Sequence, residues 1–284
     1  MLSDILSDQL IYSTVMINCF NSFGVSGCGT GFFMRKVFLD GTNINAIVTN
    51  KHVVRNYDFA KITFVTTTNG NDPNDSKQKT ICINDLQKKT VCHPDPSIDI
   101  CLLFVNDEID DFNKANAGVT IFYRAINTDM VLLPDDSDSL TSIEDVIMIG
   151  YPDGIIDKYN NKPVVRKGIT ATGLKLDYNG SSDFLIDISC FYGSSGSPVF
   201  LRKDHLVKEK TVNGLLLDLL PNYTLIGIIH AMSVAKTDGK LVQKEIPTSL
   251  NSIVKMDIPL NLGYVTKAYK ILEIFDIVYS QING

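Results

Sequence analysis

Short segments with β-strand character follow one another at nearly even spacing along most of the chain, and turn-forming residues separate them. The first set covers residues 13–20, 29–37, 45–49, 61–66, 80–84 and 100–105, with an exposed hairpin loop expected at 67–78. The second set covers residues 145–149, 167–176, 184–188, 198–201, 211–219 and 225–230. Because no long helical pattern lies between these segments, the chain is predicted to be an all-β protein built of barrels rather than a parallel α/β sheet.

Helical spacing of apolar residues is confined to the two ends of the chain and one short turn. Residues 1–10 predict a short helix that caps the first lobe, and residues 135–142 predict a loop with a brief helical turn. The pattern at 264–282 predicts a C-terminal helix packed on a barrel, with Lys270, Glu273 and Asp276 facing water.

The composition excludes several classes of function. The chain has 284 residues, 44% of them hydrophobic, which is enough for two lobes with cores of their own. Its net charge of −6 argues against a nucleic-acid partner, because binding phosphates needs a basic surface. No run approaches the roughly 20 apolar residues of a membrane span, and the first residues lack the basic start and apolar core of a signal peptide. We therefore expect no membrane association.

The six cysteines do not form a pattern typical of a disulfide framework or a metal site. No Cys-x-x-Cys pair occurs. Most of them stand in apolar runs, as buried free thiols do, and these are Cys19, Cys82, Cys92, Cys101 and Cys190. Since disulfides are rare in reducing compartments, this pattern favours a cytoplasmic protein.

A cluster of small residues at Gly193-Ser194-Ser195-Gly196-Ser197-Pro198 gives the first indication of chemistry. A nucleophilic hydroxyl needs backbone that lets a carbonyl approach closely, together with amide hydrogens that face the developing negative charge. Glycines on both sides of Ser195 give that access, because they lack a Cβ atom and tolerate positive φ. By itself such a cluster is more often an ordinary turn.

A serine nucleophile requires a base, and only four histidines are available. His52 ends the β-branched run that begins at Ile47, and it is the candidate base. His93 and His205 stand in polar or charged surroundings and are expected to be solvated at the surface. His230 follows the apolar run 225–229, which fits a residue that lines a cleft as well as a buried, hydrogen-bonded one. Any single histidine also fits a purely structural role.

A third group would have to orient the base, and Asp99 is the candidate. It stands where a polar loop becomes the strand-like segment 100–105, so its carboxylate would lie at the lip of a buried strand. A strand-entry or turn aspartate is the competing interpretation. Asp95, next to Pro96, is the better candidate for a turn residue.

Four blocks of the sequence, in order, resemble the signature blocks of trypsin-like serine peptidases, and the intracellular and HtrA-type branch without a PDZ domain is the closer match. The blocks are Gly29-Thr30-Gly31-Phe32-Phe33, Val48-Thr49-Asn50-Lys51-His52-Val53-Val54, Asp99-Ile100-Cys101-Leu102-Leu103 and the cluster 193–198. The candidate histidine, aspartate and serine occur in the family's order, with 46 and then 95 residues between them. Together with 150–152 and 226–230, the resemblance covers about residues 10–275.

The resemblance implies a chymotrypsin-like fold of two six-stranded antiparallel Greek-key barrels followed by a C-terminal α-helix. It divides the chain into residues 1–117, with the N-terminal helix, the first barrel, His52 and Asp99; residues 118–262, with the second barrel and Ser195; and residues 263–284, the C-terminal helix. It implies a Ser195–His52–Asp99 triad that hydrolyses peptide bonds through an acyl-enzyme, with the backbone N–H groups of Gly193 and Ser195 as the oxyanion hole. It implies a protein or peptide substrate and neither a metal nor an organic cofactor.

The resemblance also implies a pocket for the residue before the cleaved bond. Its walls are expected from two segments, namely Ser189, Cys190, Phe191 and Tyr192, and His230, Ala231 and Met232. Ser189 falls where a carboxylate would select Lys or Arg, so the pocket is expected to prefer uncharged substrate side chains. Met232 is expected to narrow it. Alternatively, His230 would recognise a polar substrate side chain. Ser194 replaces the aspartate by which secreted relatives are activated, so control by a loop, a signal or a partner protein is expected instead.

Other functions fit the same blocks. A trypsin-like fold with a misaligned triad would be a catalytically inactive binding or scaffold module, and an esterase would use the same triad. A third alternative, a purely structural β-barrel protein, is the least favoured, because all the blocks would then occur in this order by coincidence. An α/β-hydrolase is excluded, because its Gly-x-Ser-x-Gly elbow needs a glycine where Ser197 stands and a helix where a β-like run follows.

Overall fold

The structure, a computed structural model, describes residues 6–211, 214–240 and 253–283. In the first half of the chain, one mainly antiparallel sheet has the strand order β5-β4-β1-β2-β3-β7-β6, with β8 paired to β4 and β9 paired to β2. The strands are β1 (Thr14–Phe20), β2 (Ser26–Val37), β3 (Asn43–Thr49), β4 (Phe59–Thr67), β5 (Asn74–Asn84), β6 (Thr90–Cys92), β7 (Cys101–Leu103), β8 (Thr120–Phe122) and β9 (Ile126–Asn127). Each of the six segments predicted for this lobe overlaps one of these strands, but the sheet has nine strands in the described residues rather than six.

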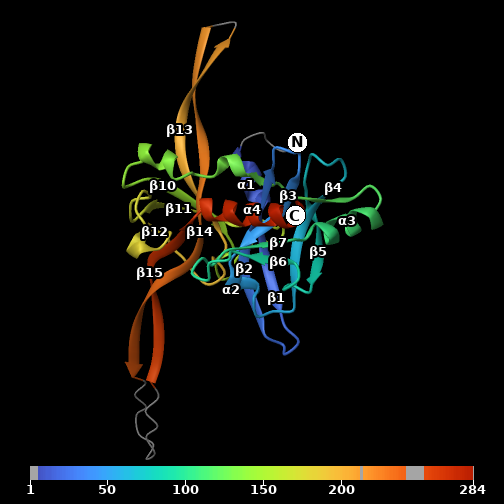
Figure 1. Ribbon diagram of the computed structural model, residues 1–284, viewed down its shortest axis with the longest axis horizontal. Helices are drawn as coiled ribbons and strands as arrows, with labels where there is room; N and C mark the ends of the chain where they lie inside the picture. The colour runs from blue at the N-terminus through green and yellow to red at the C-terminus, as the bar shows by residue number, and fades with distance from the viewer. Residues whose placement is uncertain (1–5, 212–213, 241–252, 284) are drawn as a thin grey trace, which may run out of the picture.

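The second half forms a closed antiparallel barrel in the order β10-β11-β12-β15-β14-β13, as the resemblance implied. Its strands are β10 (Asp145–Gly150), β11 (Val164–Thr170), β12 (Asp183–Asp187), β13 (Pro198–Thr211), β14 (Gly214–Lys240) and β15 (Ile253–Lys267). Two segments predicted as separate strands, 211–219 and 225–230, belong largely to the single strand β14. Because β14 pairs with β13 and then with β15, two long ribbons extend from the barrel in opposite directions (Figure 1).

The helices are short apart from the last one. They are α1 (Leu6–Ser13), α2 (Lys51–Val54), α3 (Asn106–Ala115) and α4 (Tyr269–Asn283), with 3-10 turns at Thr128–Met130, Asp135–Ser139, Pro152–Gly154 and Tyr178–Gly180. The turn predicted within 135–142 is confirmed, whereas α3 was not predicted. The C-terminal helix begins later than predicted, because Tyr264–Lys267 closes the barrel as the end of β15.

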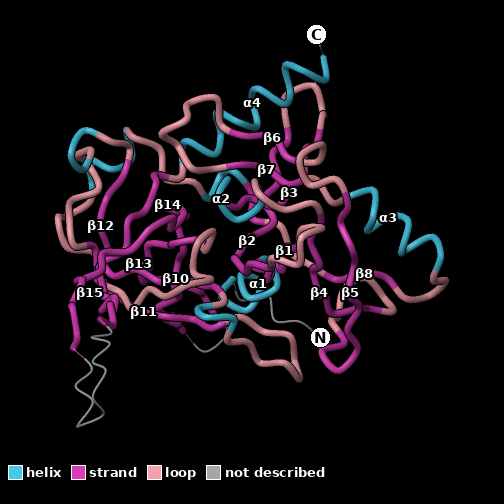
Figure 2. The backbone as a smooth tube through the Cα atoms, turned by 90° about the horizontal axis from the view of Figure 1, so that it is seen from below, coloured by secondary structure: helices cyan, strands magenta, loops and turns pink. Residues whose placement is uncertain are grey.

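Helix α4 joins the two lobes through an apolar face. Ile271, Ile274 and Phe275 are fully buried and share one core cluster with Leu102 of β7 and Phe200 of β13. In Figure 2 the helix runs across the side where the sheet and the barrel meet. Burying a side chain of this size contributes about 1.5–3 kcal/mol, so α4 holds the two lobes in a defined position.

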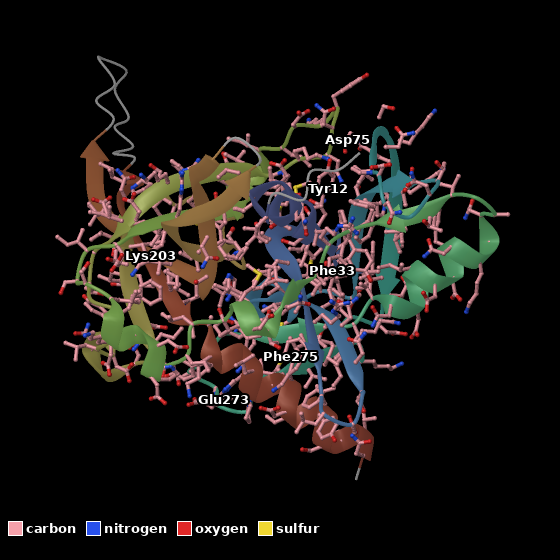
Figure 3. All side chains as sticks on the ribbon, turned by 90° about the horizontal axis from the view of Figure 1, so that it is seen from above. Tyr12, Phe33, Asp75, Lys203, Glu273 and Phe275 are labelled. Carbon is pink, nitrogen blue, oxygen red and sulfur yellow. The ribbon has the colours of Figure 1, made fainter. Side chains whose placement is uncertain are left out.

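The polar face of α4 is only partly left to solvent: Asp276 is exposed, as predicted, whereas Lys270 and Glu273 are half-buried and bonded. Glu273, labelled in Figure 3, has its Oε2 atom 3.0 Å from Nε2 of His93 and accepts a hydrogen bond from Lys270. The prediction that His93 is a solvated surface residue is wrong, since it is only 5% exposed. The polar loop that contains His93 is covered by α4, whose Glu273 lies 180 residues later in the chain. His205 lies outside the side chains that the structure describes.

A second set of contacts joins the lobes on the opposite side of the sheet. Asp75 on β5 accepts hydrogen bonds from the Tyr12 hydroxyl at 3.1 and 3.2 Å and from Lys162 Nζ at 2.6 Å. Tyr12 and Asp75 face each other in Figure 3, and the Lys162 ammonium lies 4.0 Å from the centre of the Tyr12 ring. These contacts fix the segment 155–163, which follows the 3-10 turn beside the serine loop.

Candidate active site

His52 lies at the rim of the first lobe, in a one-turn helix that directly follows the end of a strand. Strand β3 stops at Thr49, and α2 places Val53 and Val54 in the core, which directs His52 to the rim. Asn50, between the two elements, donates from Nδ2 to the main-chain carbonyl of Asp99 at 2.6 Å. The imidazole is 36% exposed and can therefore reach both the aspartate and a substrate.

Asp99 meets His52 in the way that orienting an imidazole requires. Its Oδ1 accepts the main-chain N–H of His52 at 3.1 Å, and its Oδ2 contacts His52 Nδ1. Burial opposes ionisation of this carboxyl, but the hydrogen bonds and charge of His52, with a smaller effect from His230, hold its pKa below the ordinary value. An ionised Asp99 at Nδ1 leaves Nε2 of His52 free to act as an acceptor. Asp95 has the turn role that the sequence predicted, because its Oδ1 accepts from the N–H of Ser97 at 2.8 Å.

The loop around Ser195 leaves two amide groups available. The N–H groups of Ser194, Gly196 and Ser197 are bonded to main-chain carbonyls at 2.9–3.0 Å. In the part of the chain that the structure describes, those of Gly193 and Ser195 have no acceptor. Gly193 and Gly196 both adopt positive φ, at +80° and +88°. Two free donors beside a serine are the arrangement that stabilises a developing oxyanion.

Thr30 ties this loop to the first lobe. Its hydroxyl donates to the Gly193 carbonyl at 2.8 Å and accepts from the N–H of Tyr151 at 3.1 Å. Its main-chain N–H donates to the Ser195 carbonyl at 2.8 Å. A Cβ atom at Gly196 would overlap the Thr30 carbonyl oxygen, so glycine is required there. Thr30 stands in one of the family blocks of the sequence, but no local pattern predicted its role.

A pocket of about 300 Å³ opens between the two lobes at these residues. It is lined by His52, Cys190, Phe191, Tyr192, Ser194, Ser195, Ile229, His230, Ala231 and Met232. The structure therefore brings His52 and Ser195 to one pocket, although no hydrogen bond joins Ser195 Oγ to His52 among the described residues. Ser194 and Ile229 were not expected there. Ser189 was expected and is outside the lining, where its carbonyl accepts from Arg166 at 2.5 Å.

His230 is the second imidazole of this pocket. Its Nε2 lies 3.3 Å from Oδ2 of Asp183, a close contact that does not have the alignment of a regular hydrogen bond. Burial opposes ionisation of Asp183, but contacts with His230, Thr266 and Ser181 keep its pKa below the ordinary value. Among the described side chains, no three His, Cys, Asp or Glu residues cluster as metal ligands do.

A closed six-stranded barrel, a second β-sheet lobe and a C-terminal helix define a chymotrypsin-like protein, and the site lies where the lobes meet. The chain belongs to the trypsin-like peptidase family, because the family model for the trypsin-like peptidase domain matches residues 29–207. The closer similarity to the HtrA-type branch stays a prediction. Within the described ranges, no helix combines the length and the apolar character that crossing a bilayer requires.

Three solved structures that are similar to the chain are proteases of low sequence identity. Tobacco Etch Virus protease is 10% identical with a TM-score of 0.47, over 94% of this chain and 78% of that one. The Rv3671c protease from M. tuberculosis in its active form is 14% identical with a TM-score of 0.46, over 94% and 81%. Protease Anisep from Arthrobacter nicotinovorans is 11% identical with a TM-score of 0.42, over 91% of each chain. No curated protein sequence matches the chain significantly.

Proposed function

We propose that the chain is a serine endopeptidase that cleaves proteins or peptides through an acyl-enzyme. Ser195 attacks the carbonyl carbon of the scissile bond while His52 Nε2 takes its proton. His52 then gives the proton to the leaving amine, and a water molecule hydrolyses the ester by the same route. Asp99 keeps the proton of Nδ1 in place and stabilises the imidazolium ion. The contact of His52 with Asp99 in a pocket that also holds Ser195 is the observation that carries this proposal.

The two free amides beside the nucleophile support the same chemistry. The N–H groups of Gly193 and Ser195 would donate to the oxygen that becomes negative in the tetrahedral intermediate. Removing one such donor in comparable enzymes slows the reaction by about 10²–10³-fold. Neither a metal nor an organic cofactor has a step in this mechanism.

Covalent labelling with a fluorophosphonate probe tests the proposal directly, because the probe reacts only with an activated serine. The wild-type chain is expected to gain one phosphonyl group, and the Ser195→Ala variant is expected to gain none. Ser280→Ala serves as the matched control, because Ser280 lies on the exposed side of α4 and donates only to the Asp276 carbonyl. Labelling that persists in Ser195→Ala would exclude Ser195 as the nucleophile.

Two observations support a preference for uncharged side chains before the cleaved bond. No carboxylate is among the residues that line the pocket in the described chain. Arg166 brings a positive charge to its edge, with the guanidinium 4.9 Å from the centre of the Phe191 ring. A substrate Lys or Arg in the pocket would be repelled by this charge and would find no carboxylate to pair with. Cleavage after valine or leucine is therefore expected to exceed cleavage after lysine. In a peptide library, a lysine preference would refute this, and a glutamine preference would assign recognition to His230.

A catalytically inactive binding module is the second candidate. The lack of a hydrogen bond between Ser195 and His52 in the described residues favours it, although catalytic hydrogen bonds are often long in free enzymes. Failure of the probe to label the wild-type chain would support this alternative. Comparing the turnover of matched peptide and ester substrates separates a peptidase from an esterase with the same triad. The six free cysteines support a reducing, cytoplasmic setting for either function.

A further inference from the structure

Two cysteines face each other across the hairpin that carries Asp99. Cys92 is the last residue of β6 and Cys101 is the first residue of β7, and they are direct partners in the antiparallel register. The next pair along the hairpin is joined by a main-chain hydrogen bond from His93 to Ile100 of 3.0 Å. Hydrogen-bonded and non-hydrogen-bonded pairs alternate along an antiparallel ladder, so the cysteine pair is a non-hydrogen-bonded one.

This kind of pair suits a disulfide. In a non-hydrogen-bonded pair the Cα atoms are about 4.5 Å apart, which is within the range of about 4.4–6.8 Å found for disulfide-bonded cysteines. Directly opposite residues also point to the same face of the sheet. Cys92 is exposed, whereas Cys101 is fully buried. The prediction that Cys92 is a buried thiol is therefore wrong, and so is the same prediction for Cys82, which is also exposed.

The two thiols differ in acidity in the way that disulfide formation requires. A hydrogen bond from the Cys101 thiol, together with the charge of Lys51 and against the effect of burial, lowers the pKa of Cys92 to about 6. The pKa of Cys101 is raised, because it is hydrogen-bonded to Cys92 and buried. An exposed thiolate therefore lies next to a protonated partner. Thiolates, rather than thiols, react with oxidants.

We propose that Cys92 and Cys101 are a redox modification site that forms a reversible disulfide when the protein meets a peroxide. The Cys92 thiolate attacks one peroxide oxygen; an S–O bond forms, the O–O bond breaks and hydroxide leaves. The Cys101 sulfur then attacks the Cys92 sulfur; the S–S bond forms, the S–O bond breaks and the hydroxyl group leaves as water with the Cys101 proton. The hydroxide takes up the proton that Cys92 released when it ionised, so in total the two thiols lose two electrons and the peroxide is reduced to two waters. A dithiol reverses the change by thiol–disulfide exchange.

The disulfide would act on Asp99, which lies inside the loop that it closes. Opposite Cβ atoms in such a pair are about 4.5–5.5 Å apart and must close to about 3.8 Å in a disulfide. This movement occurs two residues from Asp99, whose main chain is held by Asn50. Small shifts of positioning groups slow enzymes strongly, and about 1 Å can lower a rate 10²-fold. This consequence rests on the proposed peptidase function, so the oxidised form is expected to react with the fluorophosphonate probe at least tenfold more slowly.

Peptide mapping of the full chain tests the site without any assay of activity. After treatment with hydrogen peroxide, non-reducing digestion with a protease that cleaves before aspartate, and so between the two cysteines at Asp95 and Asp99, is expected to give one linked peptide pair, Cys92 with Cys101, with a mass about 2 Da below the sum of the two thiol peptides. Dithiothreitol should restore both thiols. Cys92→Ser is expected to abolish the link, and it should fold, because the residue is exposed. Cys82→Ser, on β5, is the matched control and should form the link as the wild type does.

The outcomes separate this proposal from the peptidase proposal. If Cys92 is oxidised to sulfinic acid while Cys101 stays a thiol, or if Cys92 links to another cysteine, the modification site is refuted. If the link forms but the probe reacts equally fast before and after oxidation, the effect on Asp99 is refuted. If the reduced protein does not react with the probe at all, the peptidase proposal fails, while the mapping still decides the disulfide.

Discussion

Replacing Thr30 with valine removes one hydroxyl group that connects the serine loop to the first lobe. That hydroxyl bonds the Gly193 carbonyl and the Tyr151 N–H, and Thr30 is completely buried. Valine has the same shape but leaves both main-chain groups without a partner. Each buried group left unpaired costs about 1–3 kcal/mol, so the two together should lower the free energy of unfolding by roughly 2–6 kcal/mol. At about 2–4 °C per kcal/mol for a large domain, that lowers Tm by roughly 4–24 °C.

The same substitution should lower the rate of chemistry more than the binding of substrate. Once the Gly193 carbonyl is no longer held, the peptide that joins Gly193 to Ser194 can turn, and the N–H groups of Gly193 and Ser195 on either side of it are no longer fixed toward the oxyanion. We expect fluorophosphonate labelling to slow by about 10²-fold, the lower end of the effect of losing one oxyanion donor. With a peptide substrate, kcat should fall by the same factor while KM changes little, because the lost interaction exists only in the transition state.

Thr49→Val is the matched control for this experiment. Thr49 is also fully buried, and its hydroxyl donates at 2.7 Å to the carbonyl of Thr30, so the variant loses one buried hydrogen bond without affecting Gly193. It should be destabilised by about 1–3 kcal/mol and should still react with the probe at close to the wild-type rate. If Thr30→Val unfolds at the wild-type temperature, or if both variants lose the same reactivity, the Thr30 hydroxyl does not hold the serine loop.

Three further predictions concern the site and its carboxylates. Gly196→Ala should lower the free energy of unfolding, measured in urea, by about 3 kcal/mol or more, because a left-handed backbone costs about 1–2 kcal/mol and the new methyl group overlaps the Thr30 carbonyl. Gly180→Ala is the control: it has a φ of +77° in open space and should show the backbone cost alone. Asp99→Asn should slow probe labelling by about 10⁴-fold with an unchanged circular dichroism spectrum, and a loss below tenfold would contradict its role. Because the pKa of Asp183 is lowered, its contribution to stability is complete above the unfolded value of 3.8 and is lost as the pH falls through the folded value. The unfolding temperature of Asp183→Asn should therefore depend less on pH below about 4 than that of the wild type.

Most strands could be predicted from the sequence, because the signals that define them are local. Runs of β-branched and aromatic residues between turn residues placed every predicted strand of the first lobe near its observed position. The first strand shows the agreement, with 13–20 expected and Thr14–Phe20 found. Helix α3 was missed because it is short and carries only two large apolar residues, Ile109 and Phe112, among polar ones. The acidic residues Asp107 and Glu108 in its first turn were the signal that could have revealed it.

The two halves of the candidate site differ in how far the sequence could predict them. Asp99 and His52 come from neighbouring strand ends of one lobe, since β3 pairs directly with β7. Their meeting therefore follows from strand pairing, and strand ends are visible in the sequence. Ser195 comes from the other lobe, and its distance from His52 depends on how the lobes pack. No local pattern shows that Thr30 and Gly193 are bonded, because 163 residues separate them.

The packing between the lobes depends on the same core that the C-terminal helix completes. Phe275 and Ile271 lie in one cluster with residues of β7 and β13, so α4 stabilises the contact surface of the lobes as well as itself. A cavity in that cluster, as in Phe275→Ala, should cost about 3–5 kcal/mol. Because the residues of the proposed triad come from both lobes, reactivity with the probe should fall together with stability, although Phe275 does not line the pocket. A Phe275→Ala protein that unfolds early but still reacts at the wild-type rate would mean that the contacts of Thr30 and those around Asp75 keep the lobes aligned without the full α4 core.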